Sequence, residues 1–169
     1  MRKLVLLVLL SLSFAGLKAQ ENVIKVNPFA LLGGNDLVSY ERALGEHSSG
    51  TIGAGYGGYQ LGGLKYKNYG ASLQYRYYFN EALTGFFGAA ALGYSKGSVE
   101  LDNDNDDIDF NSFGGGLRAG YQWIWDSGFS LDLNAGINYR SFSYEDDENV
   151  SLKGNGILPS FGLGIGYAF

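Results

Sequence analysis

A period of two in hydrophobicity constrains this chain more than any other feature of its sequence. It is clearest over residues 129–140, where Phe129, Leu131, Leu133, Ala135, Ile137 and Tyr139 alternate with Ser130, Asp132, Asn134, Gly136, Asn138 and Arg140. Successive side chains of a β-strand point to opposite faces, so one face here is apolar and the other is small or polar. A face that carries Arg, Asp and Asn cannot form a dry core. The sequence therefore predicts a barrel with its apolar face against lipid and its polar face toward the lumen.

Similar alternation marks residues 24–32, 69–79, 112–125 and 157–169. In the first of these segments the residues predicted to face lipid are Ile24, Val26, Pro28, Ala30 and Leu32. Three further segments are rich in Gly and Ala, and the pattern does not fix their facing. Together the segments predict eight strands, at residues 23–32, 36–44, 50–60, 69–79, 84–94, 112–125, 128–140 and 157–169. The predicted fold class is all-β, a transmembrane up-and-down antiparallel β-barrel over residues 20–169, with an even strand number as in bacterial single-chain barrels.

The predicted strands leave short turns on the side of the two termini and longer loops on the other side. The turns are residues 45–49, 80–83 and 126–127, and the outer loops are residues 33–35, 61–68, 95–111 and 141–156. Short periplasmic turns and longer outer loops are typical of this class. Residues 95–111 and 141–156 hold 10 of the 17 acidic residues. Such an anionic rim would repel nucleic acid and attract cations or cationic peptides, although acidity also keeps exposed loops soluble.

Residues 1–19 are expected to be a secretory signal peptide. Arg2 and Lys3 form a basic start, Leu4–Leu12 is apolar, and the small Ala19 marks the expected cut, uncertain by a few residues. The alternative is an N-terminal anchor, but the apolar run is shorter than the roughly 20 residues that a transmembrane helix needs. The expected location is therefore the outer membrane of a Gram-negative bacterium.

Composition excludes several classes of function. The mature chain loses three bases, Arg2, Lys3 and Lys18, and no acid, so its formal net charge moves from −5 to −8. An acidic protein has no general attraction for nucleic acid. The sequence has no Cys, which excludes a lipoprotein anchor through an N-terminal Cys, disulfides and thiolate metal sites. Its single His leaves little room for His-based metal or relay chemistry.

Two stretches carry a resemblance to known families. Val26–Leu32, followed by Val38–Leu44, is similar to the opening hairpin of uncharacterised barrel families, and the alternating end that closes on Phe169 resembles the signal read by the barrel-assembly machinery. The chain as a whole resembles the small OmpA/OmpX-type eight-stranded outer-membrane barrels. That resemblance implies outer-membrane lipid and the barrel-assembly machinery as partners, but no agreed activity.

Two motifs suggest chemistry but fit strands and turns better. Gly53–Gly58 matches G-x-G-x-x-G, yet nothing around it has the helical period that a dinucleotide site requires. His47 and Ser48 are residue types that small lipid A deacylase barrels use, but here they fall in a predicted periplasmic turn with no third group to orient them. We therefore expect no catalytic residue and no cofactor.

The outer loop at residues 102–113 begins like a calcium loop. Asp102, Asp104 and Asp106 have the D-x-D-x-D spacing. The sixth position is Asp107, where an EF-hand needs Gly, and the twelfth is Phe113, where it needs a bidentate Glu. An EF-hand is excluded, and the open alternatives are a weak divalent-cation site at the three aspartates or a soluble loop.

Charged residues at inward positions form the remaining constellation, namely Lys25, Glu41, Arg76, Arg118, Asp132 and Arg140. Unpaired charges in a narrow lumen are costly, so these side chains are expected to pair, with Arg118 on the strand next to Asp132 as its partner. Small residues on the inner face of the last strand are expected to make room for the long arginines. An eight-stranded barrel is only just wide enough for side chains to fill, which favours a structural plug over a conducting path.

Three functions follow from these observations. The first is a non-catalytic outer-membrane barrel with acidic surface loops and an envelope-structural or surface-interaction role. The alternative is a narrow pore or a small-ligand-binding barrel. The third, a lipid-modifying enzyme, needs a reactive centre at outer-leaflet depth, and the sequence offers none.

Overall fold

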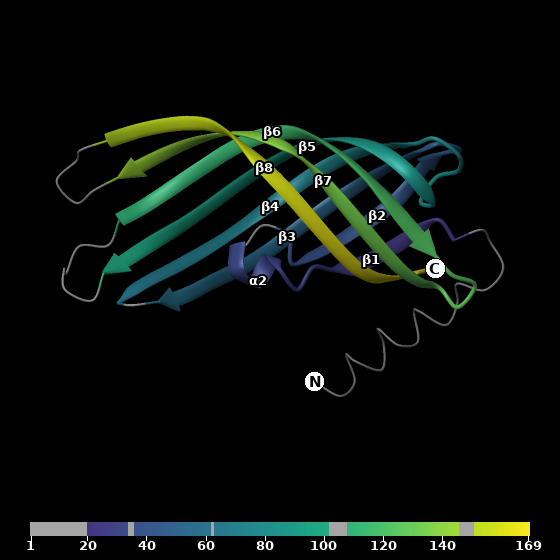
Figure 1. Cartoon of the computed structure of the whole chain (residues 1–169), viewed down its shortest axis with the longest axis horizontal. Helices are drawn as coiled ribbons and strands as arrows, with labels where there is room; N and C mark the ends of the chain where they lie inside the picture. Colours follow the sequence, from purple (N-terminus) through teal and green to yellow (C-terminus); the bar gives the residue numbers. More distant parts are fainter. Residues whose placement is uncertain (1–19, 34–35, 62, 102–107, 146–150) are drawn as a thin grey trace.

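The computed structural model describes residues 20–33, 36–61, 63–101, 108–145 and 151–169. Eight antiparallel strands form a closed barrel in which each strand pairs with the next and β8 returns to β1 (Figure 1). The strands are β1 (Asn22–Val26), β2 (Val38–Gly45), β3 (Ser48–Leu61), β4 (Leu64–Tyr78), β5 (Gly85–Leu101), β6 (Ile108–Ile124), β7 (Phe129–Glu145) and β8 (Ser151–Ala168). The predicted all-β, eight-stranded up-and-down barrel is confirmed.

The two faces of the wall have the chemistry that the alternation predicts. On β7, Leu133 and Ile137 are exposed on the outside, whereas Asp132 is buried in the lumen. The strands whose facing the sequence left open follow the same rule, since Glu41 on β2 and Thr51 on β3 are buried. Exposed aromatic residues occur toward both ends of the outward face, with Tyr56, Tyr69, Tyr94, Phe113 and Tyr139 toward the outer end and Tyr77, Phe79, Phe86, Trp125, Phe129 and Tyr167 toward the termini. Such aromatic girdles flank the apolar band of transmembrane barrels.

The strands run further at the outer end than the sequence predicts. The expected loop at residues 61–68 shrinks to the two residues between β3 and β4, and β5 and β6 extend to Leu101 and from Ile108. The predicted loop boundaries are wrong because the apolar outward face ends before the hydrogen-bonded ladder does. Lys65, for example, still pairs with Glu100 across β4 and β5. Backbone pairing needs no apolar face once the strands have left the membrane.

The predicted first strand, residues 23–32, is wrong beyond Val26. A single helical turn, α2 (Ala30–Gly33), follows β1 instead. Asn27 caps this turn, because its side-chain Oδ1 accepts a hydrogen bond from the Phe29 N–H (3.1 Å) and its carbonyl accepts one from the Ala30 N–H (3.0 Å). The turn reverses the expected facing, so that Phe29 and Leu31 are exposed and Ala30 is buried. Among the described residues no helix is long and apolar enough to cross a membrane.

The short β1 and β2 leave the wall incomplete at the outer end. β1 has 5 residues and β8 has 18, and the last pair between them is Val26 with Ile165. On the other side, the last pair between β2 and β3 is Val38 with Ala54. Beyond these points β3 and β8 keep a strand neighbour on one side only. All eight strands therefore surround the lumen only in the half nearer the termini.

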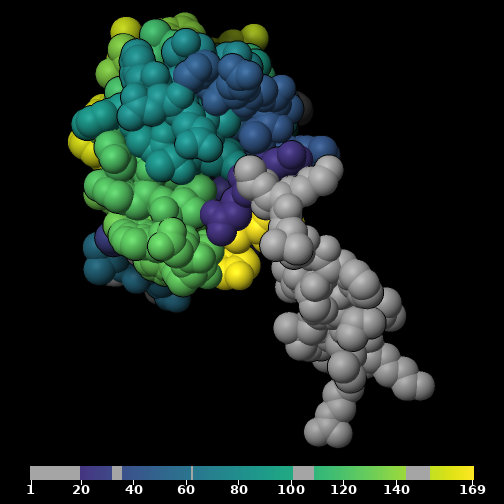
Figure 2. Space-filling model, turned by 90° about the vertical axis from the view of Figure 1, so that its right-hand side faces the viewer, coloured from purple at the N-terminus to yellow at the C-terminus, as the bar shows by residue number. Residues whose placement is uncertain are grey.

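At the end near the termini, the connection between β4 and β5 folds into the barrel mouth. Leu83, with a φ of 71° that L side chains rarely adopt, is buried in a small apolar cluster with Val23 and Ala168. Figure 2 looks onto this end, where the turns and strand ends form a surface without a visible channel outside the part that grey residues cover. The lumen is thus closed by an apolar layer on this side.

Candidate functional site

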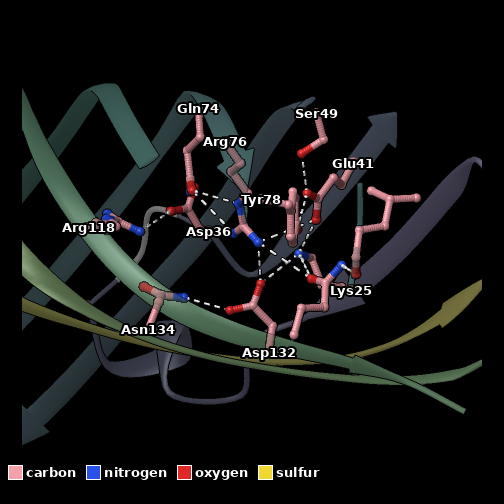
Figure 3. A network of polar contacts seen from close by, with 12 residues as sticks. Lys25, Asp36, Glu41, Ser49, Gln74, Arg76, Tyr78, Arg118, Asp132 and Asn134 are labelled. Carbon is pink, nitrogen blue, oxygen red and sulfur yellow. Dashed lines mark hydrogen bonds and ion pairs between the residues drawn. The ribbon is translucent and has the colours of Figure 1, made fainter. Parts of the chain in front are cut away.

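Four charged side chains from four strands meet in the lumen directly above this layer (Figure 3). Lys25 Nζ lies 2.6 Å from Glu41 Oε2 and 2.8 Å from Asp132 Oδ2. Arg76 Nη1 binds the same Asp132 oxygen and lies 3.4 Å from Glu41 Oε2. We call Lys25, Glu41, Arg76 and Asp132 the lumenal cluster. Its two cations and two carboxylates cancel in net charge.

Neutral polar groups satisfy the remaining hydrogen-bonding capacity of the lumenal cluster. Gln122 Oε1 accepts a hydrogen bond from Lys25 Nζ (2.8 Å), while the Gln122 amide nitrogen donates to the Leu83 carbonyl (2.7 Å) and so joins the cluster to the apolar layer. Glu41 also accepts from the hydroxyls of Tyr78 (2.7 Å) and Ser49. Asn134 donates to Asp132 (2.8 Å). Buried charges are tolerated when they are paired and hydrogen-bonded in this way.

Packing holds the four side chains in place. Their exposed fractions lie between 0% and 4%. The Arg76 guanidinium carbon lies 4.4 Å from the centre of the Phe87 ring, in the geometry of a cation–π contact. A Cβ atom at Gly164 on β8 would come within 3.1 Å of Lys25 Cδ. The small residues of β8 therefore make room for a lysine, where the sequence predicted that they accommodate arginines.

Arg118 and Arg140, the other two cations of the predicted constellation, lie outside the lumenal cluster. Arg118 Nη1 is 3.9 Å from Asp36 Oδ2, and both arginines line a second part of the lumen further from the termini. The expected pairing of Asp132 with Arg118 is wrong. The register of β6 and β7 sets Gln122 opposite Asp132 and moves Arg118 opposite Gly136. This register is a property of the assembled barrel that alternation alone does not give.

Sequence reasoning missed the neutral partners and one acid. Gln74, Gln122 and Tyr78 all occupy inward positions of strands whose alternation was recognised, so the same parity rule would have found them. Asp36 was predicted to begin the strand at 36–44, but β2 begins only at Val38, and Asp36 in the preceding connection accepts a hydrogen bond from the Ser72 hydroxyl.

The other candidates from the sequence lie within a strand, in a turn or outside the described residues. Gly53–Gly58 lies within β3 and opens no helix. His47 lies in the turn between β2 and β3, with its ring 6.0 Å from that of Tyr77. Asp102, Asp104 and Asp106 lie outside the described residues, as do residues 1–19. Among the described residues no group of three or more His, Cys, Asp or Glu side chains is placed to hold a metal ion.

Part of the acidic rim is neutralised by lysines on a neighbouring strand. Glu100, beyond the outer aromatic girdle, lies 2.5 Å from both Lys65 Nζ and Lys67 Nζ. These hydrogen bonds lower the pKa of the Glu100 carboxyl and raise that of the Lys67 ammonium. The rim is therefore less anionic at this point than the sequence suggests.

Comparison with known proteins places the chain in a family. A model of the family described as "Protein of unknown function (DUF3575)" matches residues 4–155. The chain belongs to this family. No curated protein matches the sequence.

Two solved structures are similar to the barrel. One is the crystal structure of a major outer membrane protein from Thermus thermophilus, with a TM-score of 0.50, 16% identity, and coverage of 90% of this chain and 100% of that one. The other is the translocator domain of the autotransporter NalP from Neisseria meningitidis, with a TM-score of 0.42, 14% identity, and coverage of 92% and 65%. At this identity the first structure supports the fold alone.

Proposed function

We propose that this protein is a non-catalytic outer-membrane barrel that blocks its own lumen and has a structural role in the cell envelope, with acidic loops on the outer surface. The observation that carries this proposal is the lumenal cluster, in which four buried charges from four strands are fully paired across the barrel. A path for ions needs a continuous water-filled channel. Here paired charged side chains join the walls across the lumen and take the place of water.

Two other layers support a blocked lumen. On the side of the termini, Leu83, Val23 and Ala168 form the apolar layer. Toward the outer end, the rings of Tyr66 and Phe110 stack with centres 5.8 Å apart, and Phe110 is buried. Apolar residues above and below a neutral ionic layer favour the structural role over a narrow pore.

The outward face supports insertion in a membrane. Large apolar side chains such as Leu73, Leu117 and Ile137 are more than half exposed, at 59%, 65% and 56%. In water this surface would be a strong aggregation site, whereas in a bilayer it is solvated by lipid. The expected partners are outer-membrane lipid and the barrel-assembly machinery during biogenesis.

The geometry around the single His supports a non-catalytic role. A nucleophile needs a base that a third group orients. His47 Nδ1 is buried, and among the described residues it has no hydrogen-bond partner. The pair that suggested hydrolase chemistry thus lacks an orienting group in the described part of the chain.

Three measurements test the proposal. The purified protein, reconstituted in a planar lipid bilayer, is expected to show no steady single-channel steps, and such steps would refute the blocked lumen. A deletion strain is expected to lose resistance to detergent, and expression of an Asp132→Asn variant that folds poorly should fail to restore it. The barrel itself is checked by heat-modifiability, because a closed ladder resists detergent until it is boiled. Identical migration of boiled and unboiled samples, with solubility in plain buffer, would refute membrane insertion.

A further inference from the structure

The lumen beyond the lumenal cluster holds an unbalanced positive charge. Arg118 and Arg140 line this region with one acid, Asp36. The Arg118 guanidinium contacts Asp36 only at 3.9 Å, and its Nε is buried without a hydrogen-bond partner among the described residues. Asp36 is also engaged by the Ser72 hydroxyl. Because a buried charge without a full partner is costly, this region is suited to one more anionic group.

The wall beside this region is the part that β1 leaves uncovered. Gly162 and Leu163 of β8 lie just beyond Gly164 and Ile165, where the pairing with β1 ends. Both line a cavity of about 40 Å³ that also reaches Arg118 and Asn134 and borders the lumenal cluster at Lys25, Arg76 and Asp132. With Arg118 and Asp36 this cavity has three cations and two acids, so one positive charge is left over. On the outside of the same strand there is an apolar groove of about 540 Å³. Its lining residues are Phe29, Ala119, Leu133, Ala135 and Phe161, together with Asn134, Gly162 and Leu163, which it shares with the inner cavity.

The volumes of the outer groove and of the inner cavity limit which ligand fits the site. A groove of this size is within the range of about 300–1,000 Å³ found for small-molecule sites, and its lining is almost wholly apolar. The inner cavity is much smaller, at about 40 Å³. A single water needs about 10–15 Å³ measured in the same way. The inner cavity has room for a group of about three heavy atoms. A carboxylate meets this limit, whereas a phosphoglycerol or sugar head group does not.

We propose that the uncovered edge of β8 is a lateral binding site for a long-chain fatty acid. The carboxylate lies beside Arg118 in the inner cavity, and the hydrocarbon chain leaves between β8 and the residues that follow β1 to lie in the groove under Phe29. The charge of Arg118 selects the acid, and the small side chains of Ala119 and Ala135 form the floor for the chain. This site goes beyond the structural role, because a blocked lumen needs no lateral groove.

The experiment measures palmitate binding to the whole protein in phosphatidylcholine vesicles by isothermal titration, with protein-free vesicles subtracted. We expect saturable binding of one palmitate per barrel. Arg118→Gln should weaken it at least tenfold, and Ala135→Phe, which fills the groove, should abolish it. Phe29→Ala, at an exposed position outside the strands, should weaken it severalfold. The matched controls are Arg42→Gln and Ala71→Phe, at exposed outward positions of β2 and β4, and these should bind like the wild type.

Other ligands identify the head group. Hexadecanol, which has the chain without the charge, and lysophosphatidylglycerol, which has a charge on a larger head group, should both fail to displace palmitate. Each variant is first shown to be heat-modifiable, so that loss of binding reports the site and not the fold. The proposal is overturned if palmitate shows no saturable binding or binds equally to Arg118→Gln and Ala135→Phe. Displacement by lysophosphatidylglycerol would overturn it in favour of a membrane lipid, and displacement by hexadecanol in favour of a site without charge recognition.

Discussion

Asp132→Asn is the substitution that most directly tests whether the lumenal cluster acts as one unit. It keeps the shape of the side chain but removes the carboxylate that Lys25 and Arg76 share. Two buried cations then face Glu41 alone. Breaking a buried ion pair in this way typically costs about 3–5 kcal/mol, because the surviving charge stays in a medium of low dielectric constant. We expect a loss of this size in the free energy of unfolding.

The double variant with Lys25→Met restores neutrality, since Glu41 and Arg76 remain as a matched pair. Its loss should be no larger than that of either single variant. Independent effects would instead add to about 6–10 kcal/mol, so the expected coupling energy is about 3–5 kcal/mol. The control cycle combines Asp132→Asn with Arg140→Gln, because Arg140 has no ion pair with Asp132 among the described residues. That pair should add to within about 0.5 kcal/mol.

Urea unfolding of barrels folded into lipid vesicles gives these free energies. Trp125, exposed on the outside of the barrel, reports the loss of the lipid environment by fluorescence, and the gel shift of unboiled samples reports the folded fraction. Additive losses in the Asp132 and Lys25 cycle would refute the reasoning, since they would mean that the two side chains contribute to stability independently. Equal coupling energy in the Arg140 cycle would refute the conclusion that Arg140 lies outside the lumenal cluster.

Three further outcomes are expected. Leu133→Arg on the outward face should impair folding into lipid by about 2–4 kcal/mol if the site is near the membrane centre, and normal folding of this variant would reverse the assigned faces. Leu83→Ala should cost about 2–5 kcal/mol of unfolding free energy yet leave planar bilayers silent, because the lumenal cluster still blocks the barrel; steady conductance would place the block at Leu83. The lowered pKa of Glu100 means that its contribution to stability is present above the unfolded-state pKa and is lost as the pH falls through the folded-state value. The difference in urea midpoint between wild type and Glu100→Gln should therefore shrink from about pH 7 to about pH 3, and a constant difference would argue against the ion pair with Lys65 and Lys67.

The faces of the wall were predictable because lipid and lumen impose opposite demands on neighbouring residues. Asp132 and Leu133 differ by one position, and their environments differ completely. The same parity located Lys25, Arg76 and Asp132 before any partner was known, whereas the facing of Glu41 stayed open because β2 alternates poorly. Strand ends were not predictable in this way. Lys65 and Glu100 continue the ladder between β4 and β5 where the outward face is charged and no longer apolar, because backbone hydrogen bonds hold the pair.

Local turn chemistry outweighed the alternation after β1. Asn27 followed by Pro28 is a helix-start signal, since Asn caps the free N–H groups and Pro fits the first helical position. The alternation of residues 24–32 concealed it. Partners within the lumen depend on how far each strand is shifted against the next, and the assignment of Arg118 to Asp132 failed on that shift. Asp36 and Leu83 come from connections, which no strand period describes.

The shortness of β1 connects the sealed lumen to the proposed lateral site, and the two adjoin along the inward face of β8 at Gly164 and Gly162. Gly164 touches the lumenal cluster, since a Cβ there would lie 3.1 Å from Lys25 Cδ and 3.2 Å from Asp132 Cβ. Gly162 faces Asn134 and lines the groove. Gly164→Ala should therefore crowd the cluster and cost about 1–3 kcal/mol in the free energy of unfolding. Its loss of palmitate affinity should be smaller than that of Gly162→Ala, because Gly164 lines the inner cavity but not the groove. A Cβ at Gly162 would lie 2.6 Å from the amide nitrogen and oxygen of Asn134, so this amide would have to turn and give up its hydrogen bond to Asp132. Gly162→Ala should therefore lower the urea midpoint slightly and weaken palmitate binding severalfold. If the two substitutions changed stability and palmitate binding in the same proportion, the lumenal cluster and the lateral site could not be told apart. The incomplete wall would then have no binding role of its own.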